Sequence, residues 1–555
     1  MSLRALSTLL LAYALGLVAA CACVRSWASL EAQGTSAIVA SVWQAGQLRA
    51  REVLTSSEER RASLDAAAGL EGATLVHETV TGTSALLVRP ELAFALSFVS
   101  GHDGVVATYG HETVYVTPSD LLARQAYDPH GVRVSGLALN AGVDPAVVWA
   151  LLSERLHTSV STLQANAVVR RARFLRSTPG RAPGAASQVT AESLSAPVVR
   201  GAMLDLARYL ARGIEDDGHY RYLVDATTNR TLPGYDWPRH AGTTYFLAQA
   251  AAVSHEPAIA MACLRAASLM RASAVSACGD AACIGKEDRV ELGSSALALI
   301  AFVEIVRTGL DPTYEPLVRD VARFLRASQR ADGEFMHEYD RAAGRPVDVQ
   351  YLYYSGEATL ALARAYRVTR DAADLAAARR GLAHLVGPAW SFFGDRYYFG
   401  EEHWTCQAAA DLPLPDAGAV DFCVRWQRYG RAMQGRAGDS AYDDDGAYGV
   451  GPVMTPRLTP VASRCEAGAA TLALLRTKGP EATREADALD RQLRRSLALL
   501  VRRQLAPGPA ELFADPDAVY GAMPGSEVDL ELRIDYAQHA GSAMVRWLEL
   551  EDPAR

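Results

Sequence analysis

An alternation of two kinds of helical sequence, repeated from about residue 198 to the end, restricts most strongly what this 555-residue chain can fold into. Segments with charged residues on one face alternate with shorter segments of small apolar residues, and each of the latter opens with polar residues. The six openings are marked by His240, Ser294, Glu357, His403, Glu466 and His539. Their mean spacing of about 60 residues accommodates two helices of about 14 residues and two connections.

The charged segments are predicted to be outer helices, because one face suits solvent and the other suits a core. They span residues 198–214, 257–272, 314–328, 372–386 and 482–504. The first and last polar openings resemble each other: Asp236 begins Asp-x-x-x-His-Ala-Gly-Thr and Asp535 begins Asp-x-x-x-His-Ala-Gly-Ser. This likeness favours a closed ring, in which the first and last helix pairs are neighbours, over an open helical solenoid.

The layout over residues 198–555 resembles the (α/α)6 toroids of the six-hairpin glycosidase-like superfamily and, more distantly, the terpenoid-cyclase toroids. The resemblance rests on the repeat and on the small-residue inner helices, and it includes no catalytic motif that defines a family. It implies a mainly α protein whose C-terminal domain is an (α/α)6 toroid.

The N-terminus is predicted to be an export signal. Arg4 precedes an apolar run from Ala5 to Ala20, and the run ends in Val18-Ala-Ala-Cys21. A basic start, an apolar stretch and small residues before a cleavage site are typical of a secretory signal, here over residues 1–20. The last four residues resemble a bacterial lipobox, which implies lipidation of Cys21. An uncleaved anchor helix over residues 3–24 is the alternative, and both interpretations predict an exported, membrane-anchored protein.

Between the signal and the ring, we predict a tether or helical stalk over residues 21–70, a small α+β module over 71–176 and a linker over 177–197. Short β-branched or aromatic runs indicate strands at 73–80, 92–99, 104–109 and 112–116. Pro118 and Asp144 indicate helix starts. An arginine-rich run from Arg170 to Arg181, followed by Ala, Ser, Pro and Gly, is interpreted as part of the linker region.

Six cysteines follow the signal region, and an even number in an exported protein indicates disulfides. They are Cys263, Cys278, Cys283, Cys406, Cys423 and Cys465. Cys278 and Cys283 are the favoured local pair. No Cys-x-x-Cys spacing or neighbouring histidine supports a zinc site, so no metal is expected.

In such a ring the N-termini of the inner helices point toward one mouth, where their polar residues would converge. The predicted catalytic residues are Glu357, Glu466, Glu402, Asp236 and Asp535. Glu357 and Glu466 fall inside apolar segments, where a charge is costly without a partner or a purpose. A structural role is the alternative for each carboxylate. Glu357 and Glu466 could form ion pairs with Arg239 or Arg464, and Asp236 and Asp535 could cap the N-termini of their helices.

The predicted substrate-binding residues are Arg239, His240, Tyr353, Tyr354, His403, Trp404, Arg464 and His539. Aromatic faces, arginines and histidines beside paired carboxylates suit a carbohydrate site. Burial in the core is the alternative for His240 and His539.

The function predicted is that of a membrane-anchored enzyme, a glycoside hydrolase, acting on envelope or extracellular glycans without a cofactor. A sugar epimerase or polysaccharide lyase on the same scaffold is an alternative, and the resemblance implies that the sugar 2-epimerases use histidine pairs. A non-catalytic lipoprotein that binds glycans or proteins is another. The net charge of −8 gives no basic footprint for nucleic acid. Walker, Rossmann and Gly-x-Ser-x-Gly motifs are absent from the sequence, which argues against nucleotide use and serine hydrolysis.

Overall fold

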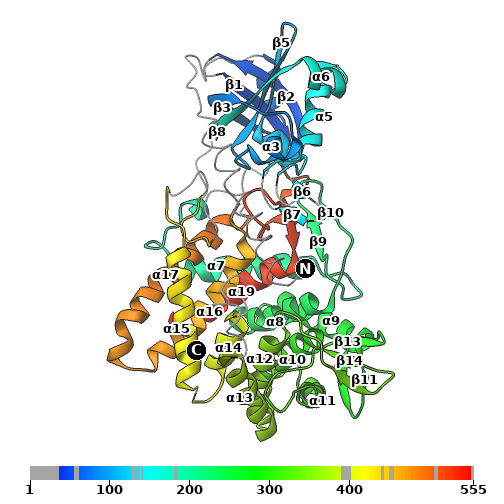
Figure 1. Cartoon of the computed structure of the whole chain (residues 1–555), viewed down its shortest axis with the longest axis vertical. Helices are drawn as coiled ribbons and strands as arrows, with labels where there is room; N and C mark the ends of the chain where they lie inside the picture. Colours follow the sequence, from blue (N-terminus) through cyan, green and yellow to red (C-terminus); the bar gives the residue numbers. More distant parts are fainter. Residues whose placement is uncertain are drawn as a thin grey trace, which may run out of the picture.

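A computed structural model of the chain has an antiparallel sheet unit stacked on one end of a ring of helices (Figure 1). The structure describes residues 37–55, 62–127, 132–134, 137–139, 142–179, 185–388, 402–414, 416–438, 443–448, 455–505 and 511–551. The predicted signal and Cys21 lie outside these residues. Within the described part of the chain, no helix is both long enough and apolar enough to cross a bilayer.

The sheet unit has six strands in the order β2-β1-β3-β8-β4-β5, and every neighbouring pair is antiparallel. The strands are β1 (Ile38–Gln44), β2 (Gln47–Leu54), β3 (Thr74–Ala85), β4 (Asp103–Tyr109), β5 (Glu112–Val116) and β8 (Val168–Ser177). Its helices are α2 (Ala62–Ala68), α3 (Glu91–Leu96), α4 (Pro118–Ala123), α5 (Pro145–Leu156) and α6 (Val160–Asn166). A further hairpin joins β6 (Val132–Val134) and β7 (Leu137–Leu139). Phe94 of α3 stacks on Trp149 of α5, so these helices share an aromatic core.

The prediction of a helical stalk over residues 21–70 is wrong where the structure describes Ile38–Leu54. This stretch is the hairpin β1–β2, which turns at Ala45 and Gly46, both with positive φ. A two-residue turn of that conformation matches the twist of paired strands. The β-branched and aromatic residues of Ile38–Gln44 are the local signal for a strand, and almost all of them are buried.

Two other predictions for this unit are corrected. Residues 92–99, predicted to be a strand, contain most of α3, and the arginine-rich run predicted as linker enters β8. Arg171 is buried in β8 and donates to Ser84 Oγ (3.1 Å) and to the carbonyl oxygen of Ser97 (2.6 Å). These arginines therefore have internal partners, which the local sequence does not reveal.

Among the described residues, the ring has six inner helices surrounded by six outer helices. The inner helices are α8 (Trp237–Ser254), α10 (Leu292–Arg307), α12 (Tyr354–Thr369), α14 (Glu402–Asp411), α16 (Leu458–Arg476) and α19 (Ile534–Glu551). The outer helices are α7 (Ala196–Arg212), α9 (Pro257–Ser273), α11 (Glu315–Ala327), α13 (Ala372–Val386), α15 (Ala417–Met433) and α17 (Thr483–Arg503). Each inner helix packs against the next, and α19 packs against α8. The predicted (α/α)6 ring is therefore confirmed; α15 is the outer helix that the sequence analysis missed.

The amphipathic pattern explains which helices lie inside. Outer helix α11 buries one face, Val318 to Leu325, and exposes its charges, whereas α10 is buried along its length from Leu292 to Ile305. A helix that is apolar on all sides is stable only when surrounded. Small residues then allow close approach: Gly541 of α19 lies against the ring of Phe246 of α8, where no larger residue would fit.

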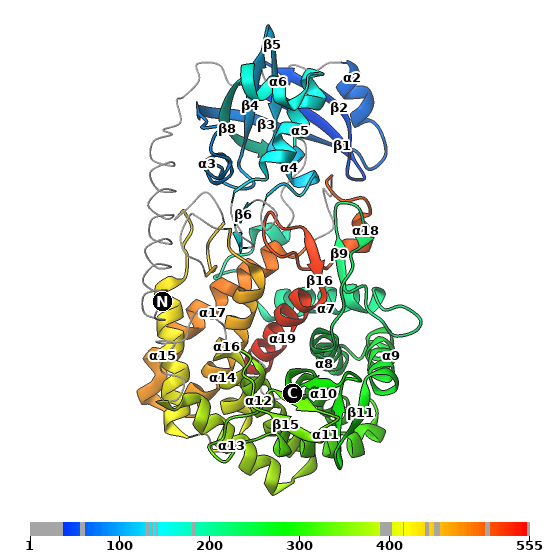
Figure 2. The same cartoon turned by 45° about the vertical axis from the view of Figure 1, so that its right-hand side comes forward.

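Short strands lead into two of the inner helices, and those of the first and last repeats lie on the side of the ring nearest the sheet unit (Figure 2). Strand β16 (Glu531–Arg533) runs directly into α19 and pairs with β9 (Leu223–Asp225), which also pairs with β10 (Arg230–Thr231). The pairing of β9 with β16 joins the first and last repeats. On the neighbouring arc, β13 (Arg289–Glu291) leads into α10 and pairs with β14 (Glu338–Asp340), and β14 pairs with β15 (Arg345–Val347).

The sheet unit is attached beside the first and last repeats. An ion pair joins Arg176 of β8 to Glu511, and the amide of Gly46 donates to the carbonyl oxygen of Glu511 (3.2 Å).

In the part of the ring domain that the structure describes, two disulfides form. The predicted pair Cys278–Cys283 is confirmed and closes the hairpin of β11 (Val275–Cys278) and β12 (Ala281–Ile284). Cys406–Cys423 ties inner helix α14 to outer helix α15. Cys263 and Cys465 are buried free thiols, so the even count does not mean that every cysteine is paired.

Candidate functional site

A pocket of about 560 Å³ lies at the mouth of the ring, where the N-termini of the inner helices meet. Every inner helix contributes to its wall at or just before its first turn. The contributing residues, in helix order from α8 to α19, include Asp236, Glu291, Tyr354, His403, Arg457 and Asp535. A single concave site therefore collects polar side chains that are up to about 300 residues apart in the sequence.

Ten of the thirteen residues predicted for the site line this pocket. They are Asp236, Arg239, Tyr353, Tyr354, Glu357, His403, Trp404, Arg464, Asp535 and His539. The other three are Glu466, which lies beneath the wall, Glu402, whose side chain is outside the described part of the structure, and His240.

His240 is a core histidine, which corrects the prediction that it binds substrate. Its Nε2 donates to the carbonyl oxygen of Ala266 on outer helix α9 (2.9 Å), and its Nδ1 is 2.6 Å from the Tyr235 hydroxyl. Burial lowers the pKa of His240 to about 4, so the ring is neutral at pH 7. Both ring nitrogens are engaged and the side chain has no access to the pocket.

Glu357 is a buried carboxyl in the first turn of α12, only 6% exposed. The facing helix makes room for it with Gly293, where a Cβ atom would lie 2.8 Å from Glu357 Oε2. Among the described residues, Oε2 has no hydrogen-bond partner. Burial raises the pKa of Glu357 to about 8, and the positive charge of Arg239 offsets this only in part. The carboxyl is therefore protonated at neutral pH and can donate a proton into the pocket.

Glu466 lies beneath the pocket and holds His539. His539 Nδ1 donates to Glu466 Oε2 (2.8 Å), and the hydroxyls of Tyr245 (3.2 Å to Oε1) and Ser542 donate to the same carboxylate. Glu466 is fully buried and His539 is mostly buried. The carboxylate thus fixes the orientation of the imidazole and leaves Nε2 as the ring nitrogen available to a ligand.

The charges of this pair support one another. Burial alone would raise the pKa of Glu466, but the charge and hydrogen bond of His539, together with His403, lower it. Burial alone would lower the pKa of His539, but Glu466 and Asp535 raise it. Each partner therefore favours the charged form of the other, an ionised Glu466 beside a protonated His539. The partner of Glu466 is therefore His539 and not Arg239 or Arg464, the partners suggested by the sequence.

His403 completes a cluster from three neighbouring inner helices, α14, α16 and α19. Its Nε2 is 4.0 Å from Glu466 Oε2, and its ring centroid is 5.5 Å from that of His539. The two rings are steeply inclined, at 72°, and Trp404 contacts both of them. Two imidazoles with unlike environments therefore face one pocket.

The same cluster has the composition of a metal site. One ligand atom each from His403, Glu466 and His539 lies within 4.8 Å of the others, an arrangement confined to this group in the part of the chain that the structure describes. No metal is expected from the sequence, because no Cys-x-x-Cys spacing or neighbouring histidine supports a zinc site. The hydrogen bond between His539 and Glu466 occupies two of the three ligand atoms, so a metal would have to displace that proton.

The two predicted aspartates are neutralised. Asp236 caps α8 by accepting from the amide of Arg239 (2.9 Å), accepts from the Tyr222 hydroxyl (2.6 Å) and forms an ion pair with the Arg239 side chain. Asp535 accepts from two nitrogens of Arg533 and lies 3.3 Å from Arg239 Nε. Burial would raise the pKa of Asp535, but Arg533 and Arg239 lower it. These carboxylates suit positioning rather than proton transfer.

The aromatic side of the pocket is formed by Tyr354, the first residue of α12, and by Tyr353 directly before it. The rings of Tyr351 and Tyr354 are 5.2 Å apart, and the Tyr354 hydroxyl donates to Glu291 Oε2 (2.5 Å). Tyr353 is 38% exposed at the mouth. On the opposite side, the guanidinium of Arg464 lies over the ring of Tyr448 at 5.2 Å. Flat rings beside charged donors are typical of sites that hold hydroxyl-rich ligands.

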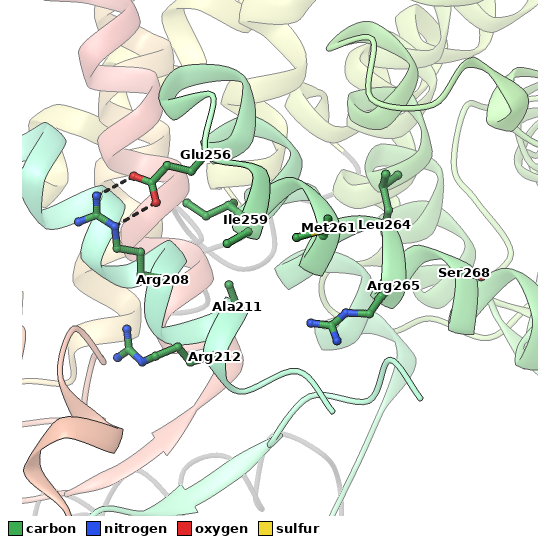
Figure 3. Close-up of a pocket in the computed structure, with 10 residues that line it drawn as sticks. Arg208, Ala211, Arg212, Glu256, Ile259, Met261, Leu264, Arg265 and Ser268 are labelled. Atoms are coloured by element: carbon green, nitrogen blue, oxygen red, sulfur yellow. Dashed lines mark hydrogen bonds and ion pairs between the residues drawn. The ribbon is translucent and has the colours of Figure 1, made fainter. Parts of the chain in front are cut away.

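A second hollow lies on the outside of the ring, between outer helices α7 and α9, and has a volume of about 740 Å³ (Figure 3). Its wall is mainly apolar and includes Ile259, Leu264 and the exposed Met261. Arg208 in this wall is held by both carboxylate oxygens of Glu256, at 3.1 and 2.6 Å. This hollow lacks the acid and base side chains found at the mouth.

No protein-family model matches the sequence, and no curated protein matches it. Solved structures with a similar ring include a cellobiose 2-epimerase from Bacillus thermoamylovorans (10% identity, 62% of this chain and 95% of that chain covered, TM-score 0.47). An unsaturated glucuronyl hydrolase from Streptococcus agalactiae is similar over 64% of this chain and 92% of that chain (12% identity, TM-score 0.43). An alpha-1,6-mannanase from Salegentibacter is similar over 54% and 99% (12% identity, TM-score 0.31). At these values the similarities assign no function, and the fold assignment rests on the closed ring itself.

Proposed function

We propose that this protein is an enzyme that moves a proton on a sugar, as an epimerase or isomerase does, with the mouth pocket as its active site. The observation that carries the proposal is the pair of imidazoles on α14 and α19, with one of them held by the buried Glu466. Exchange of a proton at carbon needs one group that takes the proton and another that gives it. His403 and His539 have the different environments that such a division requires.

In the proposed reaction the sugar is bound in its open-chain form. His403 takes the proton from the carbon next to the carbonyl carbon, and protonated His539 gives a proton to the carbonyl oxygen, so that an enediol forms. His403 then returns its proton to carbon, and neutral His539 takes back the proton of the enediol hydroxyl at which the carbonyl re-forms, so both histidines are restored. Delivery to the neighbouring carbon gives the isomer, and delivery to the other face of the starting carbon, after the enediol turns in the pocket, gives the epimer. Glu466 is a positioning residue that keeps His539 oriented and protonated.

Glu357 and the arginines would hold the substrate. The protonated Glu357 carboxyl can donate a hydrogen bond to a sugar oxygen, and Tyr353 and Trp404 offer apolar ring faces. Arg239 and Arg533, bound to Asp535, present a fixed array of N–H donors at the mouth. A hydroxyl-rich ligand fits this lining better than an apolar one.

Glycoside hydrolysis, the activity predicted from the sequence, is the second candidate, and the raised pKa of Glu357 favours it. Hydrolysis also needs a second carboxylate able to act as base or nucleophile. Asp236 and Asp535 are bound to arginines, Glu291 accepts from Tyr354, and Glu466 lies beneath the pocket. The described part of the pocket thus supplies an acid without an unengaged partner carboxylate, which is why we place hydrolysis second.

Export and membrane anchoring are part of the proposal. They rest on residues 1–21, and Cys21 would carry the lipid. Lipid labelling should mark the wild-type protein and fail to mark Cys21→Ser. A glycan of the cell envelope or surroundings is then the natural source of the substrate.

The test is a product screen on the full chain, with free mono- and disaccharides as substrates and NMR to identify the products. The proposal expects an epimer or isomer of at least one sugar, and His403→Asn and His539→Asn should each lower kcat at least about 100-fold. His111→Asn, an exposed histidine of the sheet unit, is the matched control and should keep full activity. New reducing ends that depend on Glu357 would instead establish hydrolysis, and saturable sugar binding without turnover would establish a binding protein.

A further inference from the structure

A third cavity, of about 680 Å³, opens at the end of the ring opposite the mouth pocket. Five of the six inner helices contribute residues from their C-terminal halves to its wall, together with Arg200 of outer helix α7. The mouth pocket and this rear cavity share no lining residue. The rear cavity is therefore a separate site.

The wall of the rear cavity carries more positive than negative charge. Its arginines are Arg200, Arg307, Arg364, Arg367 and Arg546. Its carboxylates are Glu304, Asp411 and Glu549. With five arginines against three carboxylates, these residues give the wall an excess of two positive charges.

The carboxylates are shared between arginines, which leaves part of the positive charge unbalanced. Asp411 accepts from Arg364 Nε and from Arg546 Nη2, both at 2.9 Å, and lies 3.6 Å from Arg367. Glu304 accepts from Arg307 (2.7 Å). Arg200 forms no ion pair with any residue that the structure describes. Arginines at helix C-termini also offset the helix dipole, but that role does not need them to surround a hollow.

Two buried polar atoms in this wall are left without hydrogen-bond partners among the described residues. They are Arg364 Nη1 and Gln249 Oε1, whose residues are 3% and 6% exposed. A charged donor that is buried without an acceptor is costly. The distance from Arg364 Nη1 to Glu304 Oε1 is 3.7 Å, which is beyond hydrogen-bond distance. Arg364 Nη1 lacks an acceptor, which an oxyanion oxygen would supply, whereas Gln249 Oε1 is itself an acceptor and lacks a donor.

We propose that the rear cavity binds a multiply charged oxyanion, a phosphate group or its sulfate equivalent. Guanidinium groups pair with such oxyanions through parallel N–H donors, and a dianion would balance the excess charge of the wall. The cavity is large enough to hold either a free phosphate ion or a phosphate carried on a small sugar. This proposal is independent of the reaction at the mouth pocket.

The experiment is calorimetric titration of the full chain with two probes, inorganic phosphate and glucose 6-phosphate. Saturable binding with one site per chain is expected, weakening as sodium chloride is raised. Stronger binding of one probe tells whether the free ion or the carried group is the better ligand. Absence of saturable binding by both probes would overturn the proposal.

Variants locate the bound anion. Arg200→Gln/Arg367→Gln removes the two arginines with the fewest internal partners and should weaken binding at least about tenfold. Arg319→Gln, an exposed arginine of α11 paired with Glu315, is the matched control and should bind as wild type does. If the double variant does not fold, each single variant should still weaken binding severalfold. Loss of binding in Arg464→Gln, at the mouth, with binding retained in the rear variants, would refute the assignment.

Discussion

Replacing Glu357 with glutamine should change how the stability of the protein depends on pH. The Glu357 carboxyl is buried with a pKa of about 8, against 4.5 for an ordinary glutamate. An acid whose pKa rises on folding adds stability that is complete below the pKa of the unfolded chain. This contribution is lost as the pH rises through the folded-state pKa. Glutamine cannot ionise, so the variant lacks this dependence.

The magnitude follows from the two pKa values. One pKa unit corresponds to about 1.36 kcal/mol, so the rise from 4.5 to about 8 corresponds to about 5 kcal/mol. Between about pH 4.5 and pH 8 the free energy of unfolding of the wild type should fall by about 1.4 kcal/mol per pH unit relative to Glu357→Gln. Above about pH 8 the difference should stay constant.

Urea unfolding of both proteins at intervals from pH 5 to 9 measures this difference, because the remaining ionisable groups are common to both. Infrared difference spectra should also show a protonated-carboxyl band that titrates near pH 8 and is absent from the variant. Glu315→Gln, an exposed glutamate of α11, is the control and should stay within about 0.5 kcal/mol of the wild type throughout. A difference between wild type and Glu357→Gln that does not vary with pH would refute the argument.

Three further predictions concern the ring. Arg364→Met should lower the free energy of unfolding, measured by urea denaturation, by about 3–5 kcal/mol, because it leaves the buried Asp411 and Glu304 with one partner fewer. Arg319→Met on the surface is the control and should lower it by less than about 1 kcal/mol. Gly293→Ala would press a methyl group against Tyr354 and Glu357 and should lower the free energy of unfolding by about 1–3 kcal/mol, as measured by thermal unfolding. Gly201→Ala on α7, where the added methyl group meets open space, is the control and should be neutral or stabilising. The double variant Cys406→Ala/Cys423→Ala should lower the free energy of unfolding by about 3 kcal/mol, because the disulfide no longer closes a loop between residues 17 apart. Alkylation of the denatured, non-reduced wild type should label Cys263 and Cys465 but neither Cys406 nor Cys423.

The ring could be predicted from the sequence because its cause is local and repeated. Each inner segment joins a polar opening to a run of small apolar residues, and each outer segment has one charged face. Helix α15 has the same pattern, with a buried face from Ala419 to Gly430 and exposed charges at Asp421, Arg425 and Arg428, so this helix was predictable and was overlooked. The hairpin β1–β2 was missed because Ala-rich neighbours suggested a helix, while Ala45 and Gly46 form its turn.

The sequence predicted most of the residues that line the site, but it did not predict which of them bond to one another. His240 and His539 stand in nearly the same motif, yet His240 bonds to a carbonyl oxygen on α9 and His539 to Glu466 on α16. Sequence position gives the helix turn on which a histidine lies. The hydrogen-bond partners of its imidazole depend on which neighbouring helix the side chain faces, and the packing of the helices decides this.

Solvent deuterium incorporation tests the central claim most directly. With a sugar identified in the product screen, turnover in D₂O should place one deuterium on the carbon next to the carbonyl, as measured by NMR and mass spectrometry. His539→Asn and His403→Asn should abolish this incorporation, and His111→Asn should leave it unchanged. Conversion of the sugar without deuterium at that carbon, or incorporation that persists in both histidine variants, would contradict the account.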